Sequence, residues 1–419
     1  MDQQLFRLIR SEVKREGDTI DLIPSENIAP PELLRVLGSP LTNKYAEGYP
    51  GSRYYPGNQH IDDIEELAKK RALNAFNLLP SNWHANVQAY SGSPANQAVY
   101  FALAKPGDAL MGLSLSSGGH LTHGHRVSFS GTVYRAVHYG LDVRGYINYD
   151  ELEEIAKREQ PRIIVSGATA YPRIIDFKRF GAIAKTVGAY HVADISHIAG
   201  LIAAGIHPSP FEHADVVTTT THKTLRGPRG AVIFSRKQKG KSGMEKTTIS
   251  ESIDKAIFPG LQGGPHMNVV AGIAWTFGEV RKNHFRTYAK KVVENARVLS
   301  KALMQSGFSL VSGGTENHLM LLDLRSLNIS GRAAEEKLEA AGIIANRNTI
   351  PGDEKPFNPS GVRIGTPSIT ARGMGKREMI EIAACIRRIL IDREATAPVG
   401  REVKKIAARF PLPYAIHSW

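Results

Sequence analysis

The chain of 419 residues contains a single cysteine, Cys385, and lacks any run of about 18 consecutive apolar residues. One cysteine excludes an intrachain disulfide and fits a reducing compartment. The missing apolar run excludes a membrane-spanning helix of the usual kind. Residues 1–17 are charged and amphipathic and lack the apolar core of a signal peptide. We therefore expect a cytoplasmic chain that does not associate with membranes.

Low-complexity tracts and internal repeats are also missing. Apolar residues make up 42% and charged residues 22%, which is typical of a globular chain long enough for two or three domains. The net charge of +13 is spread along the sequence, and its densest run, residues 237–241, is expected to be a flexible loop. This distribution favours a basic face that attracts anionic substrates over a nucleic-acid interface.

Helical and strand patterns alternate between about residues 60 and 235. Strands are expected at 84–90, 162–166, 189–193 and 215–218. Helical spacing of apolar residues is found at 61–76, 95–104 and 178–187. Alternation of this kind predicts an α/β fold in which a mostly parallel sheet is covered on both faces.

A second pattern follows the Gly/Pro-rich bend at 259–265, which is a natural boundary marker. A long helical region is expected at about 269–305. After it come a strand at 319–324, a helix at 333–341, a strand at 361–365 and a helix at 375–391. These elements predict a smaller α+β unit.

The sequence around Lys223 indicates a chemical function. A run of Val and Thr at 216–221, after Asp215, ends abruptly in His222 and Lys223, before a Gly/Pro turn between two arginines. Open α/β sheets bind ligands at the carboxyl ends of their strands. Lysine forms a Schiff base with a carbonyl cofactor when its surroundings lower its pKa. The segment predicts that Lys223 holds pyridoxal phosphate, against the alternative of an ordinary solvated lysine.

Pyridoxal phosphate also needs a phosphate cradle, an acid at its pyridine nitrogen and packing on its ring. The turn at 91–94 opens a helix, where free N–H groups and the Ser93 hydroxyl can bind an anion. Asp194 ends a strand and can pair with a protonated pyridine nitrogen. His120 offers a flat imidazole. A helix-capping turn and an N-cap aspartate are the alternatives for the first two.

A zinc site is a further possibility, because His120, His123 and His125 lie close together in the sequence. No cysteine and no obvious carboxylate ligand accompanies them. We therefore expect no metal.

Longer motifs give the chain a resemblance to the serine hydroxymethyltransferases, which are pyridoxal phosphate enzymes of fold type I. They occur in the family's order between about residues 20 and 375. These motifs are Leu22-Ile-Pro-Ser-Glu-Asn27, residues 41–51, Arg53-Tyr-Tyr55, Ser91-Gly-Ser93, Gly118-Gly-His-Leu-Thr-His-Gly124, Val217 to Leu225, Gly227-Pro-Arg-Gly230, Phe258-Pro-Gly260, Gln262-Gly-Gly-Pro265, Val311-Ser-Gly-Gly314, Asn317-His-Leu319 and Arg363-Ile-Gly-Thr-Pro367.

The resemblance implies an α/β fold whose large domain is like that of aspartate aminotransferase. Its sheet is expected to be mostly parallel and of the seven-stranded type. An N-terminal helical arm would occupy residues 1–50, the cofactor-binding large domain 51–270, and the small C-terminal α+β domain 271–419.

The resemblance also assigns residues to the cofactor. They are Lys223 at the aldehyde, Asp194 at the pyridine nitrogen, His120 on the ring face, His197 and Thr169 near the phenolic oxygen, and Gly92, Ser93 and His222 at the phosphate. Tyr45 and Gly264 would reach the phosphate in a neighbouring subunit. The resemblance therefore implies a homodimer with shared active sites.

For the substrate, the family pattern implies that Arg363 and Ser25 bind the amino-acid carboxylate and that Arg229 helps to position the site. Glu47 and Tyr55 would face the serine hydroxyl and the one-carbon acceptor. A partly buried carboxylate such as Glu47 can exchange protons near neutral pH, although a solvated loop glutamate is the alternative.

A reduced pterin would be bound by a third group of residues. They are Leu115, Gly119, Leu121, Asn348, Lys355 and Phe357.

The activity implied is the reversible transfer of the serine hydroxymethyl group to tetrahydrofolate, which gives glycine and 5,10-methylenetetrahydrofolate. This reaction belongs to one-carbon metabolism and glycine biosynthesis. A pterin-independent 3-hydroxy-amino-acid aldolase and an α-methylserine hydroxymethyltransferase remain alternatives on the same scaffold, and RNA binding is a remote one. Departures from the family pattern at Ser117, Thr169, Ser196 and 55–59 leave open whether the carrier is folate or a modified pterin.

Overall fold

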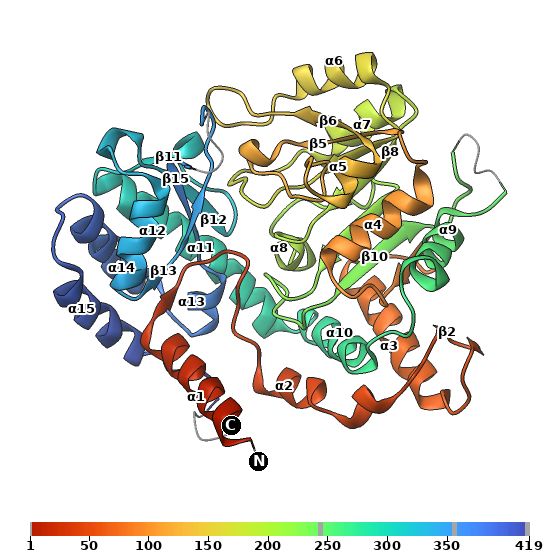
Figure 1. Ribbon diagram of the computed structural model, residues 1–419, viewed down its shortest axis with the longest axis horizontal. Helices are drawn as coiled ribbons and strands as arrows, with labels where there is room; N and C mark the ends of the chain where they lie inside the picture. Colours follow the sequence, from red (N-terminus) through yellow and green to blue (C-terminus); the bar gives the residue numbers. More distant parts are fainter. Residues whose placement is uncertain (1, 242–245, 354–357, 415–419) are drawn as a thin grey trace.

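The computed structural model describes residues 2–241, 246–353 and 358–414, and within them one seven-stranded sheet forms the centre of the larger lobe (Figure 1). Its order is β4-β10-β9-β8-β7-β5-β6, and β10 runs antiparallel to both of its neighbours while β9, β8, β7, β5 and β6 are parallel. The strands are β4 (Trp83–Asn86), β5 (Ala109–Leu113), β6 (Arg135–Tyr139), β7 (Ile163–Ser166), β8 (Tyr190–Asp194), β9 (Val216–Thr220) and β10 (Ala231–Arg236). The predicted mostly parallel sheet is confirmed.

The sheet is buried on both faces, which explains its continuous apolar strands. Along a strand, successive side chains point to opposite faces. Met111 and Ile164 belong to the core on one face, whereas their neighbours Leu110 and Ile163 belong to the core on the other. Both faces must therefore be covered by helices, as a parallel sheet requires.

Helices pack against each face of this sheet (Figure 1). One face is covered by α3 (Gln59–Ala75), α6 (Tyr149–Glu159), α7 (Phe177–Thr186), α8 (Ala199–Ala203) and α10 (Met267–Val280). The opposite face is covered by α4 (Gly92–Leu103) and α9 (Ile249–Lys255), with α5 (Phe129–Val133) beside them.

A smaller lobe is built on a four-stranded antiparallel sheet of order β11-β12-β15-β14 in the same described ranges. Its elements are β11 (Ser309–Leu310), β12 (Leu319–Asp323), α12 (Gly331–Ala340), β14 (Asn346–Asn348), β15 (Gly361–Gly365), α13 (Pro367–Ala371), α14 (Lys376–Leu390) and α15 (Thr396–Ala408). Helix α11 (Asn283–Gln305) joins the lobes, since its first half packs in the core of the large lobe and its second half in that of the small lobe.

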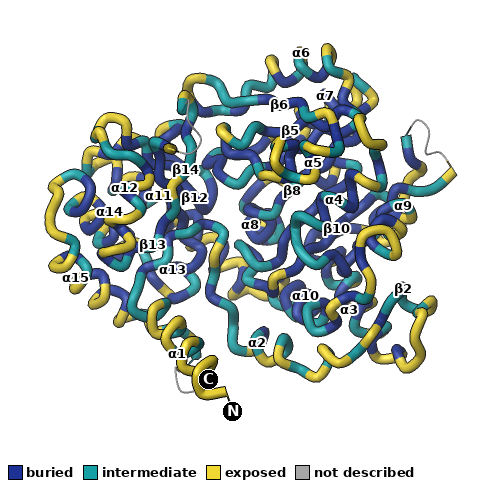
Figure 2. Tube along the Cα trace, in the orientation of Figure 1, coloured by how far each residue is buried: buried dark blue, intermediate teal, exposed yellow. Residues whose placement is uncertain are grey.

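The N-terminal segment contacts both lobes. Helix α1 (Gln3–Asp18) has no buried residue and is largely exposed in Figure 2. The short strand β1 (Ile20–Asp21) pairs with β13 (Ile343–Ile344) of the small lobe, and α2 (Pro31–Leu37) packs on α10. The predicted arm thus begins against one lobe and continues along the other.

Several predicted elements differ in detail from the observed ones. The helical region expected at 269–305 is two helices, α10 and α11, separated at 281–282. The strand expected at 84–90 ends at Asn86, and the helix expected to begin at residue 95 begins at Gly92. The domain boundary at 270 stays a prediction, although this position lies inside α10. No helix in the described ranges is long and apolar enough to cross a membrane.

Candidate functional site

A cavity of about 480 Å³ lies where β7, β8 and β9 end and α4 begins, and β14 and β15 of the small lobe contribute to its wall. This is the carboxyl edge of the parallel strands, where open α/β sheets bind ligands. Its lining residues are Ser25, Glu26, Ser91, Gly92, Ser93, Asn96, His120, His123, Ala168, Thr169, Asp194, Ser196, His197, Thr220, His222, Lys223, Arg229, Asn348 and Arg363.

Lys223 follows β9 and places its amino group in this cavity. Its Nζ donates to Thr220 Oγ1 at 2.9 Å. Burial lowers the pKa of Lys223 to about 8, because the ammonium ion loses hydration. The Asp194 carboxylate opposes this change, whereas Arg229 and Arg363 add to it. A substantial fraction of the amine is therefore neutral and nucleophilic near physiological pH.

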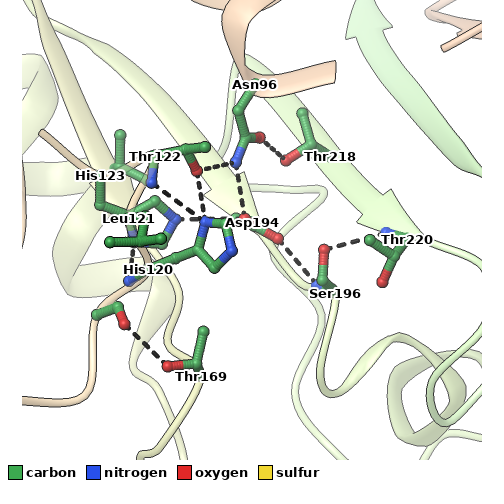
Figure 3. A network of polar contacts seen from close by, with 12 residues as sticks. Asn96, His120, Leu121, Thr122, His123, Thr169, Asp194, Ser196, Thr218 and Thr220 are labelled. Carbon is green, nitrogen blue, oxygen red and sulfur yellow. Dashed lines mark hydrogen bonds and ion pairs between the residues drawn. The ribbon is translucent and has the colours of Figure 1, made fainter. Parts of the chain in front are cut away.

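Asp194 ends β8 and is held by hydrogen bonds on both carboxylate oxygens (Figure 3). Oδ2 accepts from Asn96 Nδ2 at 2.9 Å and lies 3.2 Å from His123 Nε2, while Oδ1 accepts from the Ser196 N–H at 3.0 Å. Asn96 is fixed in turn, since Thr218 Oγ1 donates to its Oδ1 at 2.7 Å. The carboxylate has one orientation toward the cavity.

The surroundings keep Asp194 ionised. Burial alone would raise the pKa of Asp194, but the hydrogen bond and charge of His123, helped by His120 and Ser196, lower it well below its usual range. His123 Nδ1 accepts from the backbone N–H of His120 at 3.3 Å. The Nε2 of His123 is therefore the nitrogen that donates to the Asp194 carboxylate. The described residues contain no cluster of three or more His, Cys, Asp or Glu arranged to hold a metal ion.

His120 lies on the wall of the cavity next to this network (Figure 3). Its Nδ1 is 2.7 Å from Thr122 Oγ1 and accepts from the Thr122 N–H at 3.2 Å, which fixes the plane of the ring. Burial, with the charges of His123 and Lys223, lowers the pKa of His120 to about 4. The imidazole is therefore neutral at physiological pH, and its flat face can stack on an aromatic ligand.

The other end of the cavity is suited to an anion. Ser93 lies in the first turn of α4, where backbone N–H groups lack intrahelical partners. Among the described residues, the buried His222 Nδ1 has no hydrogen-bond partner. Burial, with the nearby Lys223 and Arg229, lowers the pKa of His222 to about 3, so a neutral His222 ring lines the same cavity as Ser93.

Arg363 reaches the cavity from β15 and is almost fully buried. Its Nη1 donates to the Thr169 carbonyl at 2.7 Å and its Nε to Asn346 Oδ1 at 3.1 Å. Burial lowers the pKa of Arg363 to about 10, which leaves it cationic at neutral pH. Ser25 and Asn348 line the same cavity. A carboxylate ligand would therefore meet a buried, oriented guanidinium.

Thr169 also connects the walls of the cavity. Its hydroxyl donates to the carbonyls of Gly118 and Gly119 at 3.1 and 2.8 Å. A side chain at Gly119 would place its Cβ 1.9 Å from the Leu113 carbonyl oxygen. The predicted pterin-binding glycine is thus required for close backbone packing, whichever ligand is bound. The neighbouring Leu121 is nearly half exposed, and Leu115 lies in the short helical turn just before Gly118.

Four predicted residues form a second cluster outside this cavity. Tyr45 and Gly264 line a separate cavity of about 700 Å³. The rings of Tyr45 and Tyr55 are 5.0 Å apart, and a Cβ at Gly263 would lie 3.1 Å from Glu47 Oε1. Of the described residues, those lining the Lys223 cavity do not include this group. Within one chain, the two sets of predicted residues are therefore separate.

A buried ion pair holds the loop that carries Glu47. Arg53 Nη2 lies 2.6 Å from Glu65 Oε2, and both side chains are nearly inaccessible to solvent. Arg53 Nη1 donates to the carbonyls of Ala46 and Gly48, which flank Glu47. The backbone on either side of Glu47 is thus fixed, while its side chain belongs to the exposed cluster. Lys355 and Phe357, the remaining predicted pterin contacts, lie outside the described residues.

Pyridoxal phosphate fits the residues that surround the Lys223 cavity. The cavity combines a partly neutral lysine, an ionised Asp194, a neutral flat His120, and an anion-binding end with the unpartnered His222 Nδ1. These groups match an aldehyde, a pyridinium, an aromatic ring and a phosphate respectively. The donor set is therefore complementary to the whole cofactor.

Some residues of the cavity carry no role in the sequence analysis. Asn96 binds Asp194 directly, and Thr220 binds the Lys223 amine. Asn27, which is outside the lining, donates to the Lys223 carbonyl at 2.8 Å and so holds the turn that carries Lys223. Spacing could have indicated Asn96, because it lies one helical turn after Ser93 in α4. The contacts of Thr220 and Asn27 depend on tertiary packing.

Comparisons with known proteins agree with this geometry. Residues 1–386 match the family model for serine hydroxymethyltransferase. A protein from Acidothermus cellulolyticus named serine hydroxymethyltransferase is 50% identical over 423 aligned positions, which cover 98% of this chain and 96% of that protein. One from Desulfotalea psychrophila with the same name is 49% identical over 420 positions, covering 99% and 96%. All residues that line the Lys223 cavity fall inside these matches.

Proposed function

The chain belongs to the serine hydroxymethyltransferase family, and from this premise we propose that it moves the serine hydroxymethyl group reversibly to tetrahydrofolate. The products are glycine and 5,10-methylenetetrahydrofolate. The observation that carries the proposal is the convergence of Lys223, Asp194 and Arg363 on one cavity. An amine, a carboxylate and a guanidinium arranged in this way can hold both pyridoxal phosphate and an amino acid.

Pyridoxal phosphate, when bound, supplies an electron sink for the carbanion that is left when the bond between Cα and Cβ breaks. Lys223 would hold its aldehyde and Asp194 its pyridine nitrogen. His120 would pack on the ring, and Ser93, Gly92 and His222 would bind the phosphate. Because Asp194 is fixed by three hydrogen bonds, it stays ionised without further rearrangement.

Arg363 would bind the carboxylate of serine, with Ser25 beside it. Its guanidinium is already oriented by Thr169 and Asn346, so little conformational entropy is lost when the substrate binds. A fixed carboxylate also fixes which bond at Cα is oriented for cleavage. Arg229 would maintain the positive potential of the cavity near Lys223.

Glu47 and Tyr55 would act in the cavity of a second copy of the chain. The support is their position, because they lie with Tyr45 and Gly264 in an exposed cluster away from Lys223. In a homodimer, Tyr45 and Gly264 would complete the phosphate site of the partner. Glu47 would exchange the hydroxyl proton of serine. We infer a homodimer with shared active sites that functions in the cytoplasm.

The pterin would lie beside Leu121, Leu115 and Gly119, with Asn348 at the cavity wall. An exposed Leu121 next to a polar cavity suits a ligand with an aromatic head and a solvated tail. Lys355 and Phe357 are proposed contacts from the sequence alone.

Label transfer tests the proposal. The purified chain, loaded with pyridoxal phosphate, is given serine labelled at its side-chain carbon, with and without tetrahydrofolate. With tetrahydrofolate, we expect rapid formation of labelled methylenetetrahydrofolate and an equal amount of glycine. Without tetrahydrofolate, serine cleavage should be much slower. Serine cleavage that proceeds equally well without the pterin would instead identify an aldolase, and transfer to a modified pterin alone would revise the carrier.

A further inference from the structure

Two buried histidines from different lobes meet behind the cavity. His197 follows β8 in the large lobe, and His318 directly precedes β12 in the small lobe. His197 Nδ1 lies 3.2 Å from His318 Nε2, and the ring centroids are 5.5 Å apart. His318 is fully buried, whereas His197 lines the cavity. The pair therefore links the small lobe to the wall of the site.

The position of His318 is well determined by its neighbours in the chain. The Thr366 N–H donates to the His318 carbonyl at 3.1 Å, and β12 pairs with β15, which carries Arg363. Asn317, the preceding residue, donates to the Tyr171 carbonyl at 2.9 Å in the other lobe. The same strand pair thus positions both Arg363 and His318 against the large lobe.

Both rings are neutral. Burial, with the positive charges of Arg363, His207 and Lys223, lowers the pKa of His318 to about 3. Burial, with Lys223 and Arg363, also lowers the pKa of His197 well below its usual value. A neutral imidazole has one N–H and one lone pair. Of the two nitrogens that face each other, one must therefore donate and the other accept.

The remaining nitrogen of His318 distinguishes the two arrangements. Its Nδ1 is buried and has no hydrogen-bond partner in the described residues. If His197 donated, this Nδ1 would carry a buried N–H without an acceptor, in a region of positive potential. If His318 donates, Nδ1 carries only a lone pair, which the same positive potential stabilises. The second arrangement is favoured.

We propose that His318 is a positioning residue that fixes the tautomer of His197, so that His197 presents an Nε2–H and not a lone pair to the cavity. The proton on His318 Nε2 occupies the acceptor site at His197 Nδ1. The single proton of the His197 ring is then on Nε2. An N–H in this place complements an anionic oxygen of a bound molecule.

The role of that N–H rests on the proposed function, in which His197 lies near the phenolic oxygen of pyridoxal phosphate. The tautomer itself does not, because it is a property of the protein in any ligand state. The two ideas can therefore fail separately.

The tautomer can be measured directly in the full chain labelled with 15N-histidine. The two ring nitrogens of a neutral histidine differ widely in 15N chemical shift according to which is protonated. Signals of His197 and His318 are assigned from their absence in His197→Gln and His318→Phe. We expect wild-type His197 to be protonated at Nε2 and His318 also at Nε2, with and without bound cofactor. Protonation of His197 at Nδ1 would overturn the proposal.

Variants test the consequence. His318→Phe keeps a planar ring but removes the donor, so His197 should show a mixture of both tautomers and cofactor should dissociate about tenfold more readily. His318→Gln, whose amide can donate to Nδ1, should recover most of the Nε2 tautomer and of the affinity. The matched control is His125→Phe, which should change neither the His197 tautomer nor the cofactor affinity. His125 Nδ1 is also buried without a hydrogen-bond partner in the described residues, and His125 lies outside the cavity lining.

A purely structural role predicts a different pattern. If His318 only fills space, His318→Phe would leave the His197 tautomer unchanged, and His318→Gln would be no better than Phe. Either result would overturn the proposal. If neither the wild type nor any variant binds pyridoxal phosphate while the His197 tautomer follows the prediction, the proposed function fails and the positioning role stands.

Discussion

At the scale of single residues, three cations and two acidic residues, Asp194 and Glu26, line the cavity. Lys223, Arg229 and Arg363 lie around Asp194, which is buried and held by three hydrogen bonds. Burial, with repulsion from Arg229 and Arg363, lowers the pKa of Lys223, whereas burial alone lowers that of Arg363. A ligand that carries a phosphate and a carboxylate would offset the positive charge of Lys223, Arg229 and Arg363.

The lowered pKa of Lys223 predicts a pH dependence. Only the neutral amine attacks an aldehyde, and burial places this transition at about pH 8. In cofactor-free protein, the rate of reductive labelling at Lys223 should rise with pH and level off above about pH 8. For an ordinary lysine, the rate would level off only above about pH 10.4. Mass spectrometry of the Lys223 peptide measures the rate. An inflection near the ordinary value would show that the amine is solvated.

Replacing Arg363 by lysine should weaken substrate binding. The variant keeps a positive charge but loses the planar pair of donors and the contacts to Thr169 and Asn346. A hydrogen bond to a charged group contributes about 1.5–3 kcal/mol. The dissociation constant of serine, followed by calorimetry, should therefore rise by roughly 10- to 100-fold.

The control for this variant is Arg347→Lys. Arg347 lies on the neighbouring strand β14 and pairs with Glu335 at the surface. Serine affinity should be unchanged in the control. Equal affinity in Arg363→Lys and the wild type would exclude Arg363 as the carboxylate-binding group.

The sequence predicted individual residues best where a motif combines chemistry with a strand end. Lys223, Asp194 and Arg363 all follow or lie on buried strands, and the structure places them around one cavity. Their partners are harder to predict. Asn96 reaches Asp194 from a helix 98 positions away, and His318 reaches His197 across 121 positions. Such pairs depend on packing that local patterns do not encode.

At the scale of elements, the turn that carries Lys223 is fitted closely to helix α8. The Gly200 N–H donates to Thr224 Oγ1 at 3.0 Å, and the Thr224 hydroxyl donates to the His197 carbonyl at 3.0 Å. A Cβ at Gly200 would lie 2.4 Å from the Thr224 carbonyl oxygen. Only a residue without a side chain allows α8 to approach this turn so closely.

Gly200→Ala should therefore destabilise the protein and displace Lys223. Overpacking against backbone atoms costs about 1–3 kcal/mol, which should lower the midpoint of denaturant unfolding and weaken cofactor binding together. Gly17→Ala in helix α1 is the control. Its Cβ would meet only a side-chain atom of Leu412, at 3.9 Å. If Gly200→Ala matched this control in stability and cofactor affinity, α8 would not position the turn.

Element types followed from the sequence more reliably than element ends. Buried strands such as β7 and β9 are short apolar or β-branched runs whose period differs from that of the amphipathic helices. The break between α10 and α11 at Arg281 and Lys282 contains neither proline nor glycine. Since the apolar pattern continues on both sides, the sequence predicts one helix where the structure has two.

At the scale of the whole molecule, helix α11 belongs to both cores and sets the relation of the two lobes (Figure 1). Small-lobe residues Arg363, Asn348 and His318 meet large-lobe residues at the cavity. The second cluster, around Tyr45 and Glu47, lies elsewhere on the same chain. The proposed homodimer would bring the second cluster of one chain to the Lys223 cavity of the other.

Subunit complementation tests this arrangement. Lys223→Ala and Glu47→Gln should each be inactive as homodimers. When the two are unfolded together and refolded as an equal mixture, each mixed dimer has one site with both defects and one with neither. About one quarter of wild-type activity should return. Mixtures that stay inactive, although mixed dimers are shown to form, would mean that Glu47 acts within its own chain.

The central claim is that Lys223 holds pyridoxal phosphate in a site that couples an amino acid to a pterin. The most direct measurement is the visible absorbance spectrum of the chain with pyridoxal phosphate, then with glycine, then with glycine and tetrahydrofolate. We predict a bound-cofactor band in the wild type, altered in Lys223→Ala, and a new longer-wavelength band only when glycine and tetrahydrofolate are both present. A spectrum indifferent to tetrahydrofolate would contradict pterin coupling, and one without any bound-cofactor band would contradict the assignment of Lys223.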